Sequence, residues 1–277
     1  MGAQAGRPAA AWIAVCLGLV VAVVAASAAR AGHAAGGVPR VDHVVVVVFE
    51  NHERGSVLGS GAAPTFDALA AKYAQATDYR AVAHPSLPNY LALVSGSTHG
   101  VTTDCWPCAQ TGPTIGTQLT RRGMSWGAYA EGFPNGASFD FHHVPFLYFP
   151  GERRKVHPFS AFDPRKLPAF AFVAPDRCHD MHDCSVSTGD AWLRSFAPAI
   201  LARPSTLLFV VFDEGTTTIG GGGVVSLVVA GSGVRHHAVT TRVADHYALL
   251  RTIEDALGLP PLGAAAHRSP LQGIWRG

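Results

Sequence analysis

VDHVVVVVF, residues 41–49, is a nearly continuous run of β-branched residues. Such a run is typical of a strand buried on both faces, as in a parallel sheet covered by helices. It ends at a polar cluster, Glu50-Asn51-His52-Glu53. Runs of the same kind at 169–174 (AFAFVA), 205–212 (STLLFVVF) and 224–230 predict three more buried strands, and 124–129 predicts another.

Helical patterns occupy the segments between these runs. TFDALAAKY at 65–73 has helical spacing, and Thr65 is its expected N-cap. Further helices are expected at 114–122, 190–202 and 243–257, the last ended by Gly258 and Pro260. Residues 132–168 form an irregular excursion, and 220–223 is a flexible glycine run. Alternating strands and helices predict a layered α/β fold with a mostly parallel sheet.

The first 31 residues have the layout of a secretory signal peptide. Arg7 precedes an apolar run from Ala9 to Ala26, and small residues suited to cleavage follow. A retained membrane anchor is the alternative, because the run approaches the ~20 residues that span a bilayer. We expect cleavage, which leaves residues 32–277 as one catalytic domain without a stable membrane span. The protein is then secreted or held in the cell envelope.

Charge and cysteine content narrow the class of protein further. The net charge of +2 is too small to indicate a nucleic-acid partner. Outside the signal peptide the cysteines form two close pairs, Cys105/Cys108 and Cys178/Cys184. In an exported protein this predicts two short-range disulfides. Cys105-Trp106-Pro107-Cys108 also has the spacing of a redox motif or half a zinc site, and other pairings remain open.

Acidic residues follow three of the predicted buried strands. They are Glu50, Asp176 and the pair Asp213-Glu214. Ligands of open α/β sheets collect beyond the carboxyl ends of the strands, and buried carboxylates there need a cation. The segment DRCHDMHDC at 176–184 adds oxygen and nitrogen donors, so it predicts a site for a divalent metal such as Zn²⁺, Mn²⁺, Mg²⁺ or Ca²⁺, or for phosphate. A polar loop closed by a disulfide is the simpler interpretation.

HPSLPNY at 84–90 places a hydroxyl between two prolines. Each proline restricts its own φ and disfavours helix at the residue before it, so Ser86 is expected on a rigid, non-helical elbow near a helix N-terminus. Such a terminus favours an anion. A hydroxyl beside an anion site suggests transfer of a phosphoryl group to the side chain, although an ordinary proline-rich loop has the same composition.

Two further histidine positions are candidates. His142-His143 lies among aromatic residues of the excursion, and one of the pair is a candidate proton donor because histidine titrates near neutral pH. His246, just before the last helix, is either a further metal ligand or part of that helix's cap. A buried, hydrogen-bonded histidine is the commoner outcome at both positions.

Five blocks in this order resemble the bacterial phosphoesterase family, which contains secreted acid phosphatases and phospholipases C. They are the strand ending in FENH at 49–52, PSLPNYLALVSG at 85–96, PDRCHDMHDC at 175–184, FDEG at 212–215 and DHYALLRTIEDALGLP at 245–260. The resemblance implies a three-layer α/β/α sandwich of the alkaline-phosphatase-like type. The acid phosphatase branch is the closer match, since the chain is short and has no evident C-terminal lipid-binding domain.

The resemblance also implies roles for individual residues. Ser86 would be the nucleophile, Asn89 would donate a hydrogen bond to a phosphate oxygen, and His143 would protonate the leaving group. A metal would be held by residues from the strand ends and the histidine-rich segment: Glu50, Asn51, Asp176, His179, Asp180, His182, Asp213, Glu214 and His246. Related pyrophosphatases have an Asp-x-x-x-His pair where this chain has Asp176-x-x-x-Asp180, so a second metal of the usual kind is not expected.

The resulting functional hypothesis is a metal-assisted phosphomonoesterase that forms a phosphoserine intermediate. Its substrate would be a small phosphate ester, with phosphoinositides included among the possibilities. A phosphodiesterase or phospholipase C acting on phospholipid head groups is the first alternative, because the aromatic excursion at 139–149 offers an apolar contact surface. A non-catalytic exported binding protein is the second.

Overall fold

The computed structural model describes residues 1–3, 6 and 37–277. The expected signal peptide over residues 1–31 therefore lies almost wholly outside the described residues. Within them, no helix combines the length and the apolar character that crossing a bilayer requires. The sheet and all the residues discussed below belong to the unit that runs from Ala31 to Gly277.

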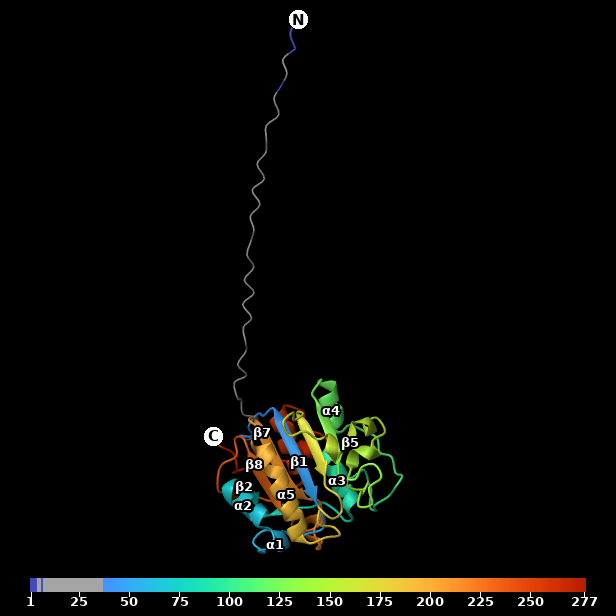
Figure 1. Cartoon of the computed structure of the whole chain (residues 1–277), viewed down its shortest axis with the longest axis vertical. Coiled ribbons are helices and arrows are strands. Elements are labelled where there is room, and N and C mark those ends of the chain that lie inside the picture. Colours follow the sequence, from blue (N-terminus) through green and yellow to red (C-terminus); the bar gives the residue numbers. More distant parts are fainter. Residues whose placement is uncertain (4–5, 7–36) are drawn as a thin grey trace. The chain divides into compact units, whose positions relative to one another are not determined.

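The run at 41–49 forms the central strand of the main sheet, as its composition predicts. Within the described residues eight strands form this sheet, in the order β5-β4-β6-β1-β7-β8-β2-β9 (Figure 1). All pairs are parallel except those that β8 makes with β7 and β2. The strands are β1 (His43–Phe49), β2 (Ala74–Ala76), β4 (Trp126–Ala130), β5 (Val156–Pro158), β6 (Phe170–Ala174), β7 (Thr206–Phe212), β8 (Leu227–Gly231) and β9 (Ala238–Thr240).

Helices cover the sheet in two layers, so the expected three-layer α/β/α sandwich is confirmed. In one layer α2 and α5 pack on each other and on β7 and β8, and in the other α3 packs on α6, which contacts β1. Figure 1 shows α2 and α5 on the near face of the sheet. The helices are α1 (Arg54–Val57), α2 (Pro64–Lys72), α3 (Ser86–Ser95), α4 (Ile115–Arg121), α5 (Val186–Leu201) and α6 (His246–Leu257).

Shorter elements complete the fold. Two short strands, β3 (Tyr79–Arg80) and β10 (Ala244–Asp245), form a separate parallel pair. The excursion at 132–168 holds β5 and the 3₁₀ turns η1 (Pro145–Tyr148), η2 (Arg153–Lys155) and η3 (Phe159–Ala161). Two more 3₁₀ turns are η4 (Ile219–Gly221) and η5 (Gly263–His267). Both expected disulfides, Cys105–Cys108 and Cys178–Cys184, are present.

Some predicted element boundaries were wrong. Helix α2 begins at Pro64 and is preceded by Ala63, because Thr65 directs its hydroxyl to the carboxylate of Asp190 on α5 instead of capping its own helix. Helix α5 starts four residues before the predicted position, at Val186. Residues 224 and 225 make only isolated bridges, so β8 starts at Leu227. A tertiary partner, not local propensity, decides the first of these boundaries.

Candidate active site

Glu50 and Asp213 lie side by side because they follow neighbouring parallel strands in register. Phe49 of β1 pairs with Phe212 of β7, and the next residue of each strand is the acid. The amide of Asp213 donates to the carbonyl of Phe49 at 2.9 Å, and the amide of Asn51 donates to Oδ1 of Asp213 at 3.2 Å. Both acidic side chains are fully buried.

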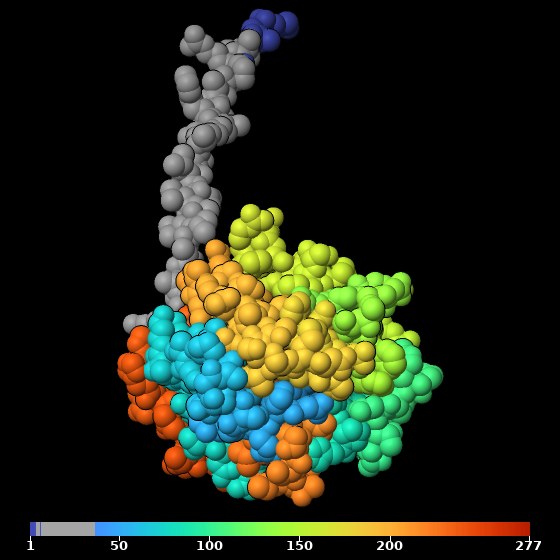
Figure 2. All heavy atoms as spheres, turned by 60° about the horizontal axis from the view of Figure 1, so that its bottom comes forward, coloured from blue at the N-terminus to red at the C-terminus, as the bar shows by residue number. Residues whose placement is uncertain are grey.

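Segments distant in sequence meet at this edge of the sheet. In Figure 2, the segments near residue 50 (blue), residue 180 (yellow) and residue 215 (orange) lie side by side on the face that comes forward. The amide of Glu50 donates to the carbonyl of Asp180 at 2.9 Å, which fixes the histidine-rich loop against the end of β1. Asp180 is therefore held next to Glu50.

Ser86 is almost fully buried and is the first residue of α3, so the predicted helix terminus is confirmed, but the prediction of a non-helical residue was wrong. Its Oγ lies 3.0 Å from Oε2 of Glu50 and 3.4 Å from Oε1 of Glu214. Three elements thus converge on one hydroxyl. This is the juxtaposition on which a nucleophilic serine depends.

Asn89 builds the elbow that presents Ser86. Its Oδ1 accepts from the amides of Val82 and Ala83 at 2.9 and 3.1 Å. Its Nδ2 donates to the carbonyls of Ala83 and Pro85 at 2.8 and 3.2 Å. Because the fully buried amide group is already occupied on both sides, Asn89 has no donor directed at a phosphate oxygen. The structure gives it a positioning role instead.

The glycine run packs against this elbow and is not a free loop. The amide of Ala81 donates to the carbonyl of Gly223, and the amide of Gly222 donates to the carbonyl of Ala81. Gly221 has a φ of +117°, and a Cβ there would collide with the backbone of Val82. The glycines therefore permit the close approach of two backbones beside the segment that leads to Ser86.

His143 reaches the same cluster from the excursion. Its ring stacks on Tyr90, with centroids 5.4 Å apart. Its Nδ1 lies 2.9 Å from Oδ2 of Asp180, and its Nε2 lies 3.4 Å from Oε1 of Glu50. Burial lowers the pKa of His143, but the hydrogen bond to Asp180 and the surrounding carboxylates outweigh this and raise it. Of the two adjacent histidines, His143 is the one in the cluster; His142 pairs with Asp140.

We call Ser86, Glu50, Asp180, Asp213, Glu214 and His143 the strand-end cluster. Its carboxyl groups carry more negative charge than its neighbours balance. Burial, together with Asp213 and Asp180, raises the pKa of Glu50 well above its usual value. Burial likewise raises the pKa values of Asp180 and Asp213, and burial together with Asp213 raises that of Glu214 to about 7. Four carboxylates thus face two imidazoles, those of His143 and His84.

This donor set fits a divalent cation. Among the described residues, Oδ2 of Asp213 is buried and has no hydrogen-bond partner. Ligand atoms of Glu50, His143 and Asp180 all lie within 4.8 Å of one another. The carboxylate oxygens of this group suit magnesium, calcium and manganese. An orphaned buried oxygen and uncompensated charge are what a cation at this position would relieve.

Four other predicted ligands, Asp176, His179, His182 and His246, are not part of the strand-end cluster. Asp176 and His179 form a separate group with Glu131, whose Oε2 lies 2.9 Å from Nδ1 of His179. His182 pairs with Asp183 at 2.7 Å. Both ring nitrogens of His246 are occupied, Nε2 by the carbonyl of Asp213 and Nδ1 by the hydroxyl of Tyr79. His246 therefore supports the strand end and has no ring nitrogen left for a metal.

Asn51 contributes its backbone to the site. Its amide holds Asp213, and its φ of +53° places it in the left-handed region that asparagine tolerates. None of the contacts described above uses its side-chain amide. The expected ligand role of Asn51 stays a prediction.

Sequence reasoning missed three contributors. Tyr90 donates its hydroxyl to Oε1 of Glu50, and His84 contacts Oε2 of Glu214 through Nδ1 at 2.5 Å. Asp104 accepts the amide of Leu87 at 2.9 Å and so caps the start of α3. Tyr90 follows Ser86 by four residues, which puts both on one helix face, so the spacing could have indicated it. Nothing local marks Asp104.

This fold, with acids at the strand ends and a serine at a helix start, defines the alkaline-phosphatase-like class. The structure resembles a protein in the alkaline phosphatase superfamily from Vibrio parahaemolyticus, with a TM-score of 0.60, 13% identity, and coverage of 79% of this chain and 67% of that one. It also resembles the phosphonate monoester hydrolase of Agrobacterium radiobacter, with a TM-score of 0.55, 14% identity, and coverage of 85% and 79%.

The sequence places the chain within one family of that class. The Phosphoesterase family profile matches residues 56–260, and the chain belongs to this family. It is 34% identical to a phosphatidylinositol-3-phosphatase of Mycobacterium tuberculosis over 89% of this chain and 87% of that protein. It is 27% identical to an acid phosphatase of Aspergillus fumigatus over 68% of this chain but only 49% of that longer protein. The chain is a hydrolase acting on phosphoric ester bonds.

Proposed function

We propose that this protein is an exported, metal-assisted phosphomonoesterase that uses Ser86 as its nucleophile. The observation that carries the proposal is the position of Ser86 Oγ, 3.0 Å from Glu50 and 3.4 Å from Glu214, at the start of a helix. A helix N-terminus attracts the anionic phosphoryl group, and the acids beside Ser86 supply a base. Relatives named as phosphatases support the same reaction class.

The proposed reaction begins with the hydroxyl proton of Ser86. Oγ donates to Oε2 of Glu50, so Glu50 is the group positioned to accept that proton. Oγ then forms a bond to phosphorus while the bond from phosphorus to the leaving alkoxide oxygen breaks. Water subsequently hydrolyses the phosphoserine, which releases inorganic phosphate and restores the serine.

His143 is proposed as the acid that protonates the leaving alkoxide. The hydrogen bond to Asp180 and the surrounding carboxylates raise the pKa of His143, which favours its protonated form, and Asp180 orients the ring through Nδ1. Nε2 is thereby directed toward the part of the strand-end cluster that holds Glu50. The orientation is the one that a general acid requires.

A divalent cation held by Glu50, Asp180, Asp213 and Glu214 would lower the pKa of the Ser86 hydroxyl and offset charge on the phosphoryl oxygens. Among the described residues, no lysine or arginine pairs with these four carboxylates. Without a cation, a phosphate dianion would face acidic groups balanced by two histidines alone. The charge balance therefore favours metal assistance over catalysis by the side chains alone.

The test is hydrolysis of p-nitrophenyl phosphate by the purified protein with added Zn²⁺, Mn²⁺, Mg²⁺ or Ca²⁺. Ser86→Ala is expected to lose activity by at least a thousandfold and to keep the thermal unfolding profile. Ser187→Ala is the matched control, because Ser187 is exposed and its hydroxyl bonds to Ser185 alone among the described residues. Full activity in Ser86→Ala would remove Ser86 as the nucleophile. Mass spectrometry of acid-quenched enzyme should find one phosphoryl group on Ser86.

A phosphodiesterase of the phospholipase C type is the alternative. Trp106, 43% exposed, packs on Phe141 with ring centroids 4.8 Å apart, so an apolar surface adjoins the His142–His143 segment. Comparing p-nitrophenyl phosphate with bis(p-nitrophenyl) phosphate separates the two functions. Dominant diester cleavage would favour the alternative, and no turnover of either substrate with any metal would favour a non-catalytic binding protein.

Export is proposed from the layout of residues 1–31 and from the two disulfides. Disulfides persist in oxidising compartments outside the cytosol. N-terminal sequencing of the protein recovered from the source cells and from their medium tests this. A mature N-terminus near residue 32 is expected, and an intact residue 1 on membrane-bound protein would indicate a retained anchor.

A further inference from the structure

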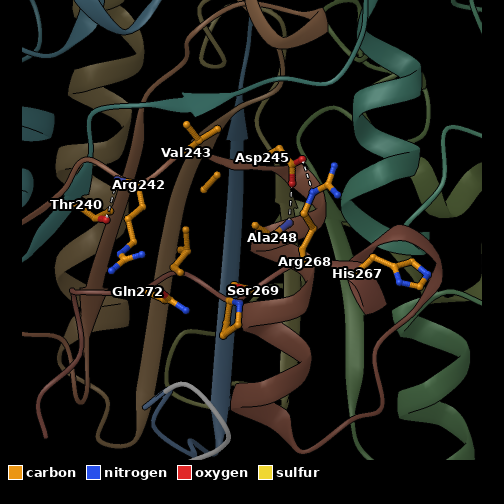
Figure 3. A pocket seen from close by; sticks show the side chains of 12 residues that line it. Thr240, Arg242, Val243, Asp245, Ala248, His267, Arg268, Ser269 and Gln272 are labelled. Atoms are coloured by element: carbon orange, nitrogen blue, oxygen red, sulfur yellow. Dashed lines mark hydrogen bonds and ion pairs between the residues drawn. The ribbon is translucent and has the colours of Figure 1, made fainter.

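A cavity of about 530 Å³ lies apart from the strand-end cluster. One wall is the connection between β9 and β10, and the other is the segment 267–272 that follows η5. Figure 3 shows Arg242 on one side and Arg268 with His267 on the other. No residue of the strand-end cluster lines it. Its volume falls in the range of about 300–1,000 Å³ that is typical of small-molecule sites.

The polar lining of this cavity carries an excess of positive charge. Arg268 is paired through Nε with Oδ2 of Asp245 at 2.8 Å, and Asp245 also caps α6 through the amide of Ala248. Each carboxylate oxygen of Asp245 thus already has one partner. The guanidinium of Arg242 has no ion-pair or hydrogen-bond partner among the described residues. One arginine of the cavity is therefore left without a counter-charge.

Other features of the lining suit a phosphate bound to a small organic group. Ser269 and Gln272 lie between the two arginines in Figure 3 and supply neutral hydrogen-bond donors. Pro270 and Leu271 are buried and give the cavity an apolar base, while the exposed Val243 lines its rim. Arginine binds phosphate through two parallel N–H donors, and the terminal nitrogens of Arg242 and Arg268 are available for this geometry.

We propose that this cavity is a second, non-catalytic site whose Arg242 binds the phosphate group of a phosphorylated molecule. The ligand is either a soluble phosphate compound or the phosphorylated head group of a lipid, since both present the same dianion. This inference does not depend on Ser86 acting as a nucleophile.

The site lies one residue from a support of the catalytic centre. Asp245 lines the cavity, and the next residue, His246, donates from Nε2 to the carbonyl of Asp213. The backbone of Asp245 in β10 is the register partner of Arg80 in β3, the strand that leads into the Ser86 elbow. Occupation of the cavity therefore acts on two segments that hold the strand-end cluster. Product phosphate bound here is positioned to alter turnover.

The experiment is calorimetric titration of the full-length protein with inorganic phosphate. Wild type is expected to bind at a site that Arg242→Ala weakens at least tenfold. Arg242→Ala is the cleanest variant, because that guanidinium supports no contact within the described fold; Arg268→Ala is the second, with its unfolding temperature measured. Arg154→Ala removes the same charge from an exposed position outside the cavity and should bind as wild type does.

A parallel arm separates the two phosphate sources. Sedimentation with phosphatidylcholine vesicles, with and without phosphatidylinositol phosphate, is compared for wild type and Arg242→Ala. Binding of free phosphate alone identifies a soluble ligand, and binding to the phosphoinositide vesicles that depends on Arg242 identifies a lipid head group. Either result supports the site. Equal binding by wild type, Arg242→Ala and Arg154→Ala in both arms would overturn it.

Discussion

Glu50 is the acid on which the most side chains of the site converge. The hydroxyl of Tyr90 donates to Oε1, and Nε2 of His143 lies near the same oxygen. The hydroxyl of Ser86 donates to Oε2. The hydrogen bond from Tyr90 stabilises the ionised carboxylate and so lowers the pKa of Glu50, against the raising effect of burial and of the neighbouring acids. The ionisation of Glu50, on which the proposed removal of the Ser86 proton depends, is thus set in part by the phenol of Tyr90.

We therefore expect Tyr90→Phe to lower kcat/KM about tenfold, the equivalent of ~1.4 kcal/mol, because a hydrogen bond to a charged group is lost. The loss removes an effect that lowers the pKa of Glu50, so that pKa rises and the acidic limb of the pH–rate profile moves to higher pH. Profiles of kcat/KM against pH check this, with Tyr73→Phe as control. An unchanged limb with unchanged activity would show that Tyr90 acts only by packing.

At the scale of elements, Asp190 joins the two helices of one layer. Its carboxylate on α5 accepts from the amides of Thr65 and Phe66 at 2.8 and 3.1 Å and from the Thr65 hydroxyl at 2.9 Å. These are the first-turn amides of α2, which lack partners within their own helix. Asp190, which lies on the neighbouring helix α5, therefore caps α2 in the way that Thr65 was expected to.

Asp190→Ala is expected to reduce the free energy of unfolding by about 2 kcal/mol, because one buried and one part-buried amide lose a charged acceptor. Urea unfolding followed by circular dichroism measures this. Thr65→Val removes only one of the three bonds and should cost about half as much or less. A cost for Asp190→Ala no larger than that for Thr65→Val would mean that water replaces the carboxylate.

Helix α6 carries an acid whose ionisation opposes folding. Glu254 is fully excluded from solvent; burial raises its pKa to about 9, although the amide of Leu262 donates to it at 2.8 Å. Between pH 4.5 and about 9 the folded state binds this proton and the unfolded state does not, so stability falls as pH rises through that interval. The fold keeps Glu254 neutral at physiological pH.

Glu254→Gln is expected to raise the thermal midpoint at pH 8.5 and to change it little at pH 5, because glutamine imitates the protonated acid. A gain of 1 kcal/mol corresponds to about 2–4 °C for a domain of this size. Differential scanning calorimetry at the two pH values tests the difference. An equal change of the thermal midpoint at both pH values would indicate a change in packing that is independent of ionisation.

For the whole molecule, the metal site proposed at the strand-end cluster would link metal binding to stability. In the absence of a cation, burial holds the pKa values of Glu50, Asp180, Asp213 and Glu214 above their ordinary values. The folded state then binds protons that the unfolded state has released, so its stability falls as pH rises from about 4 to 7. A bound cation offsets this charge.

Removal of metal with a chelator is therefore expected to lower the unfolding temperature, and to do so more at pH 7.5 than at pH 5. A cation at a hundredfold excess over its Kd contributes ~2.7 kcal/mol, which corresponds to about 5–10 °C here. Thermal melts with and without chelator, followed by restoration with each metal, provide the measurement. No dependence on chelator at either pH would argue against a cation at this position.

The sequence predicted those features that depend on local pattern. Hydrophobic runs located the buried strands, and residues directly after them, Glu50 and Asp213, meet because parallel strands end at a common edge. Close spacing and the expected export indicated the two cysteine pairs that the structure contains. These predictions succeed because strand burial and short-range cysteine geometry are set within a few residues.

Features that depend on tertiary partners were not predictable. Asn89 has an amide suited to phosphate, but the turn at 82–85 occupies it. His246 follows the pattern of a ligand, yet its two nitrogens go to Tyr79 and the carbonyl of Asp213. Asp104 and Glu131 lie in segments with no motif, and only the folded chain brings them to Leu87 and His179.

The register between β1 and β7 also bears on which ion the proposed metal site would accept. Phe49 and Phe212 are paired, so the ~4.8 Å distance between hydrogen-bonded strands sets the backbone separation of the next residues, Glu50 and Asp213. The sheet fixes the backbone separation of the two acids, so only rotation of their side chains can adjust the distance between their carboxylates. Asp180, in contrast, lies on a loop closed by Cys178–Cys184. If the strand-end cluster holds a cation as proposed, its choice between a small ion such as Mg²⁺ and a large one such as Ca²⁺ would depend on these side chains and on the position of that loop.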